Sequence, residues 1–480
     1  MRRREFLQRA AVAAGSALTG RAPASPWPMV DAPFARLVLE PARTIAIIPP
    51  DFMGLGYEIS SVARPGLLSQ QNAACVQLVR TLGSHGMIRI GGNTSDYSAY
   101  APSAQPISSP ETGPGSVVND AVLRDLGTFL KATGWKLIWG LNLGRGTESD
   151  AVAEAKAVLA ATQPSLFAFE IGNEPDLFYH NQVHRKNGYD YEDYLREYCN
   201  FRDALRKEIP GIPLAGPDTA IATSWVTRFA RNEGNDIKLL THHYYREGQN
   251  PTSSIDKLLH PDPKLSPILA ELEAASKSCG VPYRICETNS FSGGGKPGVS
   301  DAFASALWVL DFMYKLASAG CAGVNMETGV NQRGFISSYS PIGDDEHGHY
   351  SATPEFYGML AFARSGIGEV IGSHLEAGSR NLEAYATKQS NDQITLTLIN
   401  KEQAYDAIIS VESVVALRHG SVLRLSAPSL ESNTRVFFGG AAVNPDGTWH
   451  PTQPEQIQAS EGKLRVRLPA ASAAIVTLNP

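Results

Sequence analysis

The sequence has little cysteine, no long apolar run and no excess of positive charge. Five cysteines among 480 residues, without a CxxC pair, exclude a small disulfide scaffold. No stretch of about 18 apolar residues is present, so no membrane-spanning helix is expected. The 42 Lys and Arg against 48 Asp and Glu give a net charge of −6, which argues against a general nucleic-acid-binding protein. With 43% hydrophobic residues, the chain can form a large folded core.

Residues 1–24 have the features of an export signal. Arg3 and Arg4 begin an R-R-x-F-L motif, an alanine-rich stretch follows, and Ala22-Pro23-Ala24 offers an A-x-A cleavage site. This pattern predicts a bacterial twin-arginine signal and a protein that is exported, periplasmic or secreted. An N-terminal amphipathic helix over residues 1–20 is the alternative. The odd cysteine count fits a protein that folds in a reducing cytoplasm before export.

The middle of the chain alternates short apolar runs with amphipathic stretches. Eight such units in about 315 residues favour an α/β fold, a (β/α)₈ barrel, over an open doubly wound sheet. The open sheet usually carries G-x-G-x-x-G, and Gly54-Leu55-Gly56 lacks the third glycine. The expected strands are 53–59, 87–91, 136–142, 167–172, 212–216, 237–244, 283–287 and 321–326. The expected helices are 67–82, 120–133, 150–161, 191–207, 224–232, 264–278, 302–319 and 354–365.

Beyond residue 370 the pattern changes to short alternating segments separated by Gly, Pro, Asn and Ser. This is typical of an antiparallel β-sandwich. The strand-like segment 35–48 precedes the barrel and is expected to pair with the C-terminal sheet. The predicted organisation is a signal peptide at 1–24, an N-terminal strand region at 25–48, a catalytic barrel at 49–368 and a small C-terminal β-domain at 369–480.

Two glutamates lie where the barrel strands end. The fourth predicted strand leads into Asn173-Glu174-Pro175, and the seventh ends at Cys286-Glu287-Thr288. Active sites of (β/α)₈ barrels lie at the C-terminal ends of the strands. Either glutamate alone could be an ordinary solvated residue at a strand end. Both together, on the fourth and seventh strands, indicate a catalytic pair.

These motifs resemble a family of retaining glycosidases. Asn-Glu-Pro after strand four and a glutamate at the end of strand seven resemble the large clan of retaining glycosidases built on this barrel. More closely, the chain resembles glycoside hydrolase family 79, which contains bacterial β-glucuronidases and animal heparanase. The matching segments are 89–93 (RIGGN), 171–178 (IGNEPDLF), 216–218 (GPD), 242–245 (HHYY) and 287–295 (ETNSFSGGG).

The resemblance implies roles for these residues. Glu287 would be the nucleophile and Glu174 the acid/base, and retaining hydrolysis needs their carboxyl groups about 5–5.5 Å apart. Asn173 would donate to the sugar 2-hydroxyl. Tyr245 would hold Glu287 through its phenolic hydroxyl.

Further positions are expected to bind the sugar. Glu58 and Asn93 align with residues that bind the 3- and 4-hydroxyls. His243 aligns with a pocket-lining histidine, with a purely structural histidine as the alternative.

A run of three glycines follows the nucleophile. Glycines let main-chain N–H groups approach an anion without a Cβ in the way, so Gly293 and Gly294 are expected to bind the uronic acid carboxylate. Tyr339, from the loop after strand eight, is the candidate partner. A flexible turn is the alternative interpretation. Residues 343–349 (GDDEHGH) are rich in oxygen and imidazole groups but lack regular ligand spacing, so no metal and no cofactor are expected.

The sequence therefore predicts a retaining, exo-acting β-D-glucuronidase that acts on β-glucuronide-containing carbohydrate as a monomer, without nucleic-acid or membrane partners. One alternative is an endo-acting, heparanase- or hyaluronidase-like enzyme on glycosaminoglycans. Residues 100–118, which correspond to a basic segment of heparanase, contain no Lys or Arg to bind sulfates. Other families of the same clan, and a carbohydrate-binding barrel without activity, are further alternatives. The latter would be expected to lack one of the two glutamates.

Overall fold

A computed structural model describes residues 34–480 except 109–114, 181–183, 330–336, 346, 415–417, 461–462 and 480. The expected signal peptide at 1–24 lies outside the described residues. No described helix combines the length and the apolar character needed to cross a bilayer.

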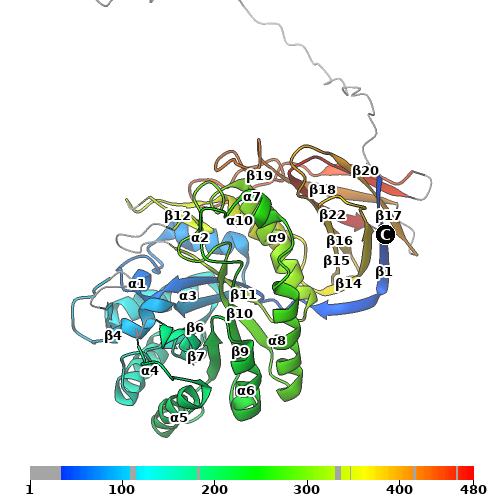
Figure 1. The fold of residues 1–480 in the computed structure, drawn as a ribbon. Coiled ribbons are helices and arrows are strands. Elements are labelled where there is room, and N and C mark those ends of the chain that lie inside the picture. Colours follow the sequence, from blue (N-terminus) through cyan, green and yellow to red (C-terminus); the bar gives the residue numbers. More distant parts are fainter. Residues whose placement is uncertain are drawn as a thin grey trace, which may run out of the picture. The chain divides into compact units, whose positions relative to one another are not determined.

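Eight parallel strands close into the predicted barrel (Figure 1). Their order round the barrel is β2, β3, β6, β7, β8, β9, β10 and β11, so each strand pairs with its successor and β11 pairs with β2. The strands are β2 (Met53–Glu58), β3 (Met87–Gly91), β6 (Lys136–Leu141), β7 (Leu166–Ile171), β8 (Leu214–Thr219), β9 (Leu239–Tyr245), β10 (Tyr283–Asn289) and β11 (Val324–Glu327). Each overlaps a predicted strand, which confirms the barrel.

The helices of the outer layer also follow the predicted segments, with one clear difference. The helix predicted over 67–82 begins at Ala73, because the Asn72 side chain accepts a hydrogen bond from the Cys75 N–H and caps it there. The main helices are α2 (Ala73–Leu82), α3 (Asp120–Thr133), α4 (Glu148–Thr162), α5 (Tyr191–Glu208), α6 (Thr223–Glu233), α8 (Leu265–Cys279), α9 (Phe303–Ser318) and α10 (Pro354–Arg364). Shorter elements are α1 (Ile59–Val62), α7 (Ile255–Leu259), η1 (Asn93–Tyr97), η2 (Pro175–Leu177) and η4 (Gly234–Asp236). Two small sheets pair β4 (Ala99–Tyr100) with β5 (Val117–Val118) and β12 (Ile342–Asp344) with β13 (Tyr350–Ala352).

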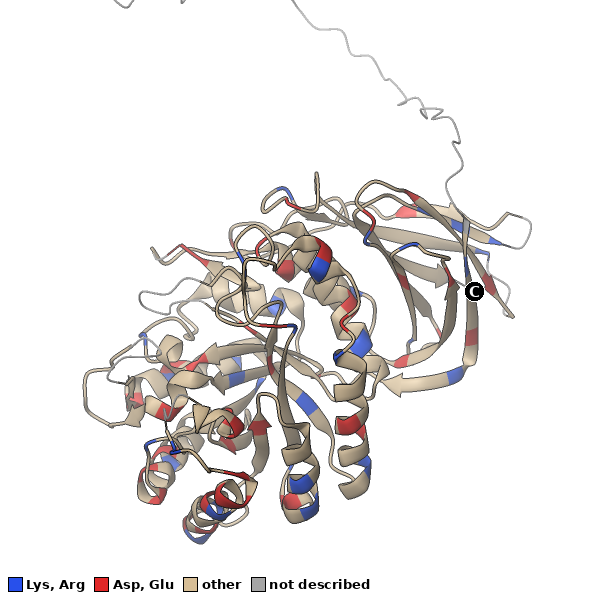
Figure 2. Cartoon of the chain, in the orientation of Figure 1, with Lys and Arg blue, Asp and Glu red and all other residues tan. Residues whose placement is uncertain are grey.

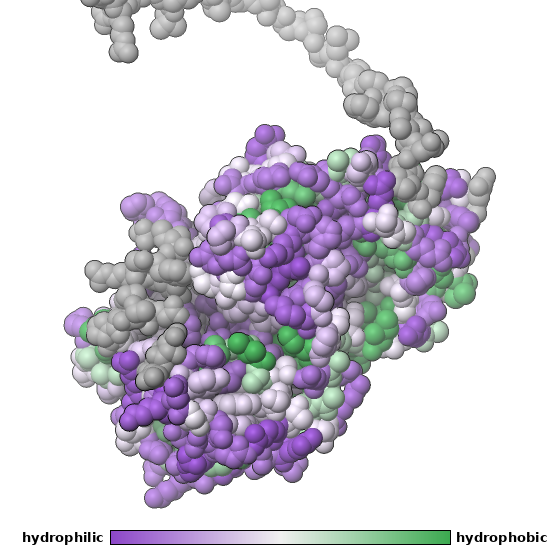
Figure 3. Space-filling view, in the orientation of Figure 1, coloured by the Kyte–Doolittle hydropathy of each residue, from purple (hydrophilic) through white to green (hydrophobic). Residues whose placement is uncertain are grey.

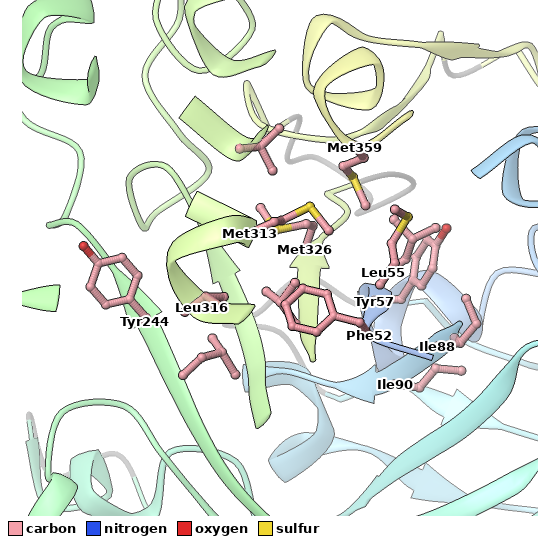
Figure 4. Close-up of a cluster of buried hydrophobic side chains, with 14 of the residues drawn as sticks. Phe52, Leu55, Tyr57, Ile88, Ile90, Tyr244, Met313, Leu316, Met326 and Met359 are labelled. Carbon is pink, nitrogen blue, oxygen red and sulfur yellow. The ribbon is translucent and has the colours of Figure 1, made fainter. Parts of the chain in front are cut away.

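The main core fills the space between the barrel strands and the helices. Leu55 and Tyr57 of β2 and Ile88 and Ile90 of β3 are buried in one cluster with the Met359 side chain of α10 (Figure 4). Side chains alternate between the two faces of a strand. The residues between these positions therefore point into the barrel, and on β3 that residue is Arg89.

The C-terminal domain is a ten-stranded sheet that takes the N-terminal strand, as predicted. The order is β19-β18-β22-β16-β15-β14-β1-β17-β21, with β20 beside β18. β1 is antiparallel to β14 but parallel to β17, so the sheet is mixed rather than purely antiparallel. The strands are β1 (Phe34–Ile47), β14 (Glu369–Glu376), β15 (Leu382–Lys388), β16 (Ile394–Asn400), β17 (Ala407–Ser413), β18 (His419–Ser426), β19 (Phe437–Phe438), β20 (Glu455–Gln458), β21 (Leu464–Leu468) and β22 (Ser472–Asn479).

A buried ion cluster joins α9 to this sheet. The Lys401 ammonium, 1% exposed, lies 2.6 Å from Asp311 Oδ2, and Lys315 lies 2.8 Å from the same oxygen. The Tyr385 hydroxyl donates to the other Asp311 oxygen at 2.6 Å. Burial by itself raises the pKa of Asp311, but Lys401 and Lys315 lower it to about 2.

Lys401→Met should lower the free energy of unfolding by about 3 kcal/mol, since it removes one cation from a buried carboxylate. Urea denaturation at pH 7 measures the change. Lys463→Met, which breaks the exposed pair with Glu412 in the same domain, should cost no more than about 1 kcal/mol. The contribution of the Asp311 carboxylate to the free energy of unfolding is present above the pKa that Asp has in the unfolded chain. It is lost as the pH falls towards 2. Equal losses in the two variants would contradict a buried, mutually dependent cluster.

The surface carries mixed charge and few apolar groups. Blue and red segments alternate along the outer helices (Figure 2), and the face in Figure 3 is mainly hydrophilic with small hydrophobic groups. Ile221 is a large apolar side chain that is 71% exposed, and it lies at the rim of the cavity described next.

Candidate active site

A cavity of about 470 Å³ opens at the C-terminal ends of the barrel strands. Strand ends supply four of its acidic groups: Glu58 from β2, Glu174 after β7, Glu287 from β10 and Glu327 from β11; Glu247, in the loop after β9, is a fifth. Of the ten residues predicted for the site, nine line this cavity; Asn173 does not, but its neighbour Glu174 does.

Glu174 and Glu287 face each other across the cavity. One carboxylate oxygen of each lies within 4.8 Å of the other and of a His243 ring nitrogen. Their side chains are 14% and 8% exposed, so both are accessible from the cavity although most of their surface is covered. This separation fits the two carboxyl groups of a retaining glycosidase and leaves no room for the water of an inverting one.

The backbone around Glu174 is fixed by neighbouring strands. Glu174 has φ 50° and ψ 49°, the left-handed region, and its N–H donates to the Asp218 carbonyl at 2.9 Å. Asn173 donates its N–H to Asp96 Oδ2 at 3.0 Å. The strain of a left-handed glutamate is thus offset by contacts from two other loops, which aims the side chain into the cavity.

Arg89 is the centre of the hydrogen-bond network below the cavity. It is fully buried, and its guanidinium donates to Glu287 Oε2 at 2.8 Å, Asn173 Oδ1 at 2.7 Å and Glu170 Oε2 at 3.2 Å. It also donates to Asp218 Oδ2 at 2.5 Å. The Arg89 guanidinium therefore positions the Glu287 carboxylate and the Asn173 side-chain amide together.

His243 links the opposite glutamate to the same network. Its Nδ1 lies 3.0 Å from Glu174 Oε1 and its Nε2 lies 2.8 Å from Asp218 Oδ1. Burial by itself lowers the pKa of His243, but Asp218 and Glu287 raise this pKa well above its usual value. The ring is therefore held as an imidazolium that donates from both nitrogens. His243 thus belongs to the site's charge network as well as being structural.

The two facing carboxyl groups have different environments. Glu287 accepts from Arg89 and from the Tyr245 hydroxyl, the latter at 3.0 Å, and such donors favour a carboxylate. Burial raises the pKa of Glu174, opposed by the His243 hydrogen bond and reinforced by the charge of Glu287. Glu174 therefore retains a proton more readily than an exposed glutamate, as a general acid must.

Three further predicted residues, Glu58, Asn93 and Asn173, are connected by hydrogen bonds. Asn173 Nδ2 donates to Asn93 Oδ1 at 3.2 Å. Glu58 accepts from the Asn93 N–H at 3.2 Å and from the Thr94 N–H at 2.8 Å, so the first turn of η1 fixes its carboxylate. These contacts place Glu58 and Asn93 together at one wall of the cavity.

The glycine run forms the opposite wall. Gly293, Gly294 and Gly295 all have positive φ, at 78°, 87° and 79°. The Gly294 carbonyl accepts from Ser338 N–H at 2.6 Å, which brings the run beside Tyr339, whose ring stacks on Tyr245 at 6.2 Å. In the described chain, no acceptor is found for the N–H groups of Gly293 and Gly294, whereas the Gly295 N–H donates to Phe291. Two neighbouring main-chain donors beside a phenol suit a small anion.

The sequence analysis named Arg89 and Asp218 only as members of motifs, without a role, and did not identify Glu170 and Glu327 as site residues. The signal for Arg89 was a charged residue inside the apolar strand MIRIG, since an unpaired charge is costly to bury. The same signal marks Glu170 in LFAFEI and Glu327 in VNME.

Among the residues that the structure describes, two groups of side chains are close enough to hold a metal ion: Glu170, Asp218 and Cys286, and Glu174, His243 and Glu287. Arg89 donates to carboxylates of both groups, and His243 lies within the second. Protein cations therefore already supply positive charge at both places. In the 343–349 loop, Asp345 accepts from the N–H groups of His347 and His349 and pairs with the His349 ring at 2.6 Å.

Comparisons with known proteins agree with this geometry. Residues 380–475 match the glycosyl hydrolase family 79 C-terminal beta domain. A beta-glucuronidase of Aspergillus niger is 26% identical over 431 residues, covering 82% of this chain and 76% of that protein. Heparanase-like protein 3 of Arabidopsis thaliana is 24% identical over 389 residues, covering 74% and 69%. A solved 4-O-α-L-rhamnosyl-β-D-glucuronidase from Fusarium oxysporum, in complex with Rha-GlcA, has the same fold with a TM-score of 0.78, at 19% identity over 92% of this chain and 100% of that one.

The barrel, the paired glutamates and these relatives define the protein as a glycoside hydrolase. Within that class its C-terminal domain matches the family 79 model and its relatives include beta-glucuronidases, so the chain is β-glucuronidase-like. This confirms the predicted resemblance to family 79 and sets aside the carbohydrate-binding barrel without activity.

Proposed function

We propose that the protein is a retaining, exo-acting β-D-glucuronidase that removes terminal β-linked glucuronic acid from glycans or glycoconjugates. The observation that carries the proposal is a carboxylate pair within 4.8 Å in a cavity that is also lined by Gly293 and Gly294 of the glycine run. The pair supports double displacement, and the glycine run supports a uronate at the sugar's C6 position.

In this mechanism Glu287 attacks the anomeric carbon as Glu174 donates its proton to the leaving oxygen. The glycosyl–Glu287 ester is then hydrolysed by a water that Glu174 deprotonates. Arg89 and Tyr245 hold the Glu287 oxygens in place for attack, and His243 orients Glu174. Asn173, fixed by Arg89, is directed to the 2-hydroxyl, where a hydrogen bond strengthens as positive charge develops on the sugar ring.

The charge of the cavity supports exo action on unsulfated ends over endo cleavage of a sulfated polymer. Among the cavity-lining residues that the structure describes, Lys264 is the single lysine or arginine. Residues 100–118, which the family resemblance aligns with a basic segment of heparanase, contain no Lys or Arg. A long sulfated chain needs several cations along its path.

The proposal is tested by release of p-nitrophenol from the β-glucuronide, the β-glucoside and the β-galactoside. The glucuronide should be preferred by about 10⁴-fold in kcat/KM, because a neutral sugar leaves the N–H donors of the glycine run without an anion to bind. Gly294→Ala should reduce glucuronide turnover at least tenfold and change the weak glucosidase rate little, since an L-residue disfavours φ 87° and the run shifts.

Gly298→Ala is the matched control. Gly298 has φ 75°, with open space where a Cβ would lie, and it is not among the residues that line the cavity. It should therefore show the same local strain without loss of glucuronide preference. If glucosides react as fast as glucuronides, or if both alanine variants lose both activities equally, the uronate assignment fails.

A further inference from the structure

Glu327 is a buried carboxyl group that lines the cavity and has no hydrogen-bond partner in the described part of the chain. It ends β11, is 3% exposed, and lines the cavity with Glu58, Glu287 and Tyr339. Neither carboxyl oxygen has a hydrogen-bond partner among the residues that the structure describes. The backbone of β2 packs against it: a Cβ on Gly56 would lie 2.7 Å from Glu327 Oε2. The group therefore cannot turn away from the cavity on that side.

Charged and phenolic groups surround Glu327 on several elements. Those facing it are Tyr57 and Glu58 of β2, Arg89 of β3, His243 and Tyr245 of β9, Glu287 of β10 and Tyr339. The two cations are already engaged: Arg89 donates to four side chains, and His243 pairs with Glu174 and Asp218. Glu327 would thus be an additional anion between the carboxylates of Glu58 and Glu287.

We propose that Glu327 is a specificity-determining residue that stays protonated and donates its O–H as a hydrogen bond to the uronate edge of the bound sugar. This inference rests on the proposed function. Glu327 lines the cavity together with Glu58, assigned to the ring hydroxyls, and Tyr339, assigned to the uronate, and it interacts electrostatically with both. The neutral acid supplies a donor where the substrate carries its negative charge, and the ionised form repels that charge.

The environment favours the protonated form. Burial, together with the carboxylates of Glu287 and Glu58, raises the pKa of Glu327 well above its usual value, and Arg89 and His243 only partly oppose this. Because the folded protein favours the neutral acid, uronate binding should be strong below this raised pKa. Above it, binding should weaken about tenfold per pH unit as the proton is lost.

The test compares Glu327→Gln and Glu327→Leu with the wild-type enzyme. Binding of phenyl 1-thio-β-D-glucuronide and the neutral phenyl 1-thio-β-D-glucoside is measured by calorimetry from pH 4.5 to 9. Gln keeps a neutral donor, so its dissociation constants at pH 5 should stay within about threefold of wild type. Leu removes the donor and should weaken glucuronide binding at least about tenfold while leaving glucoside binding unchanged. At high pH, wild type should bind the glucuronide more weakly than the Gln variant.

Glu174 and His243 titrate in all three proteins, so the ratio of wild-type to Gln dissociation constants isolates Glu327. A ratio that stays constant to pH 9, or a Leu variant that loses both ligands equally, overturns the role of Glu327. If wild type itself does not prefer the thioglucuronide over the thioglucoside at pH 5, the proposed function fails instead. Retained glucoside binding in both variants shows that the cavity is folded.

Discussion

Glu287→Gln should lower kcat on every β-glucuronide by at least about 10⁴-fold, because the amide cannot form the covalent ester on which double displacement depends. Glu287 is held by a donor on each carboxylate oxygen, Arg89 on one and Tyr245 on the other. Gln fills the same space but presents an amide NH₂ to one of these donors. Loss of the nucleophile and loss of its alignment therefore act together. Steady-state assays with p-nitrophenyl β-glucuronide at high enzyme concentration measure the residual rate.

Glu154→Gln is the matched control. Glu154, in α4, is also a buried glutamate, and it accepts a hydrogen bond from the Trp139 indole at 2.9 Å. It is not among the residues that line the cavity. The Glu154→Gln variant should keep wild-type turnover.

Proton NMR of the first product formed by wild type should show the β-anomer of glucuronic acid, as two displacements retain configuration. An α-anomer, or substantial turnover by Glu287→Gln, would exclude Glu287 as nucleophile.

Glu174→Ala should separate substrates by their leaving groups. With an alkyl glucuronide, which needs protonation, kcat/KM should fall by about 10³-fold. The fall should be far smaller with 2,4-dinitrophenyl glucuronide, which leaves without a proton. Added azide should restore turnover of the dinitrophenyl substrate, because the truncated side chain leaves space for a small nucleophile beside the anomeric carbon. The product should be β-glucuronyl azide.

The pH profile gives a second readout of Glu174. Its pKa is raised by burial, so wild-type kcat/KM on alkyl glucuronides should fall on the alkaline side as the proton donor is lost. That alkaline fall should be absent when Glu174→Ala acts on the dinitrophenyl substrate. Equal losses on both substrate types, without rescue by azide, would show that Glu174 has a structural role only.

The barrel could be predicted from sequence because each strand and helix carries its own local pattern. The short, fully buried strands β2 and β3 and the capped helices α3 and α5 could be recognised without tertiary information. The start of α2 was missed because Leu67 and Leu68 extend the apolar pattern of the helix backwards past the Asn72 cap. The glutamate pair was found because motifs at two strand ends must meet at one edge of a closed barrel.

The interactions that connect these motifs could not be predicted. Arg89 contacts residues 81, 84, 129 and 198 positions away, and no local pattern reports such partners. Glu327 ends a short strand. The properties of its carboxyl group depend on the neighbouring carboxylates and on Gly56, which packs against it. Side-chain geometry, rather than residue type, determines these roles.

The position of β1 determines when the chain can finish folding. The Arg36 side chain of β1 binds Glu376 and Glu412, which are 340 and 376 residues further along the sequence. During synthesis this strand has no partner until β14, and then β17, leave the ribosome, so it stays an exposed, pairing-competent edge while the barrel is made. Closing so long a loop is slow and makes the β-domain the last part to form. Chains truncated before β17 should therefore aggregate through β1 even when their barrel sequence is complete.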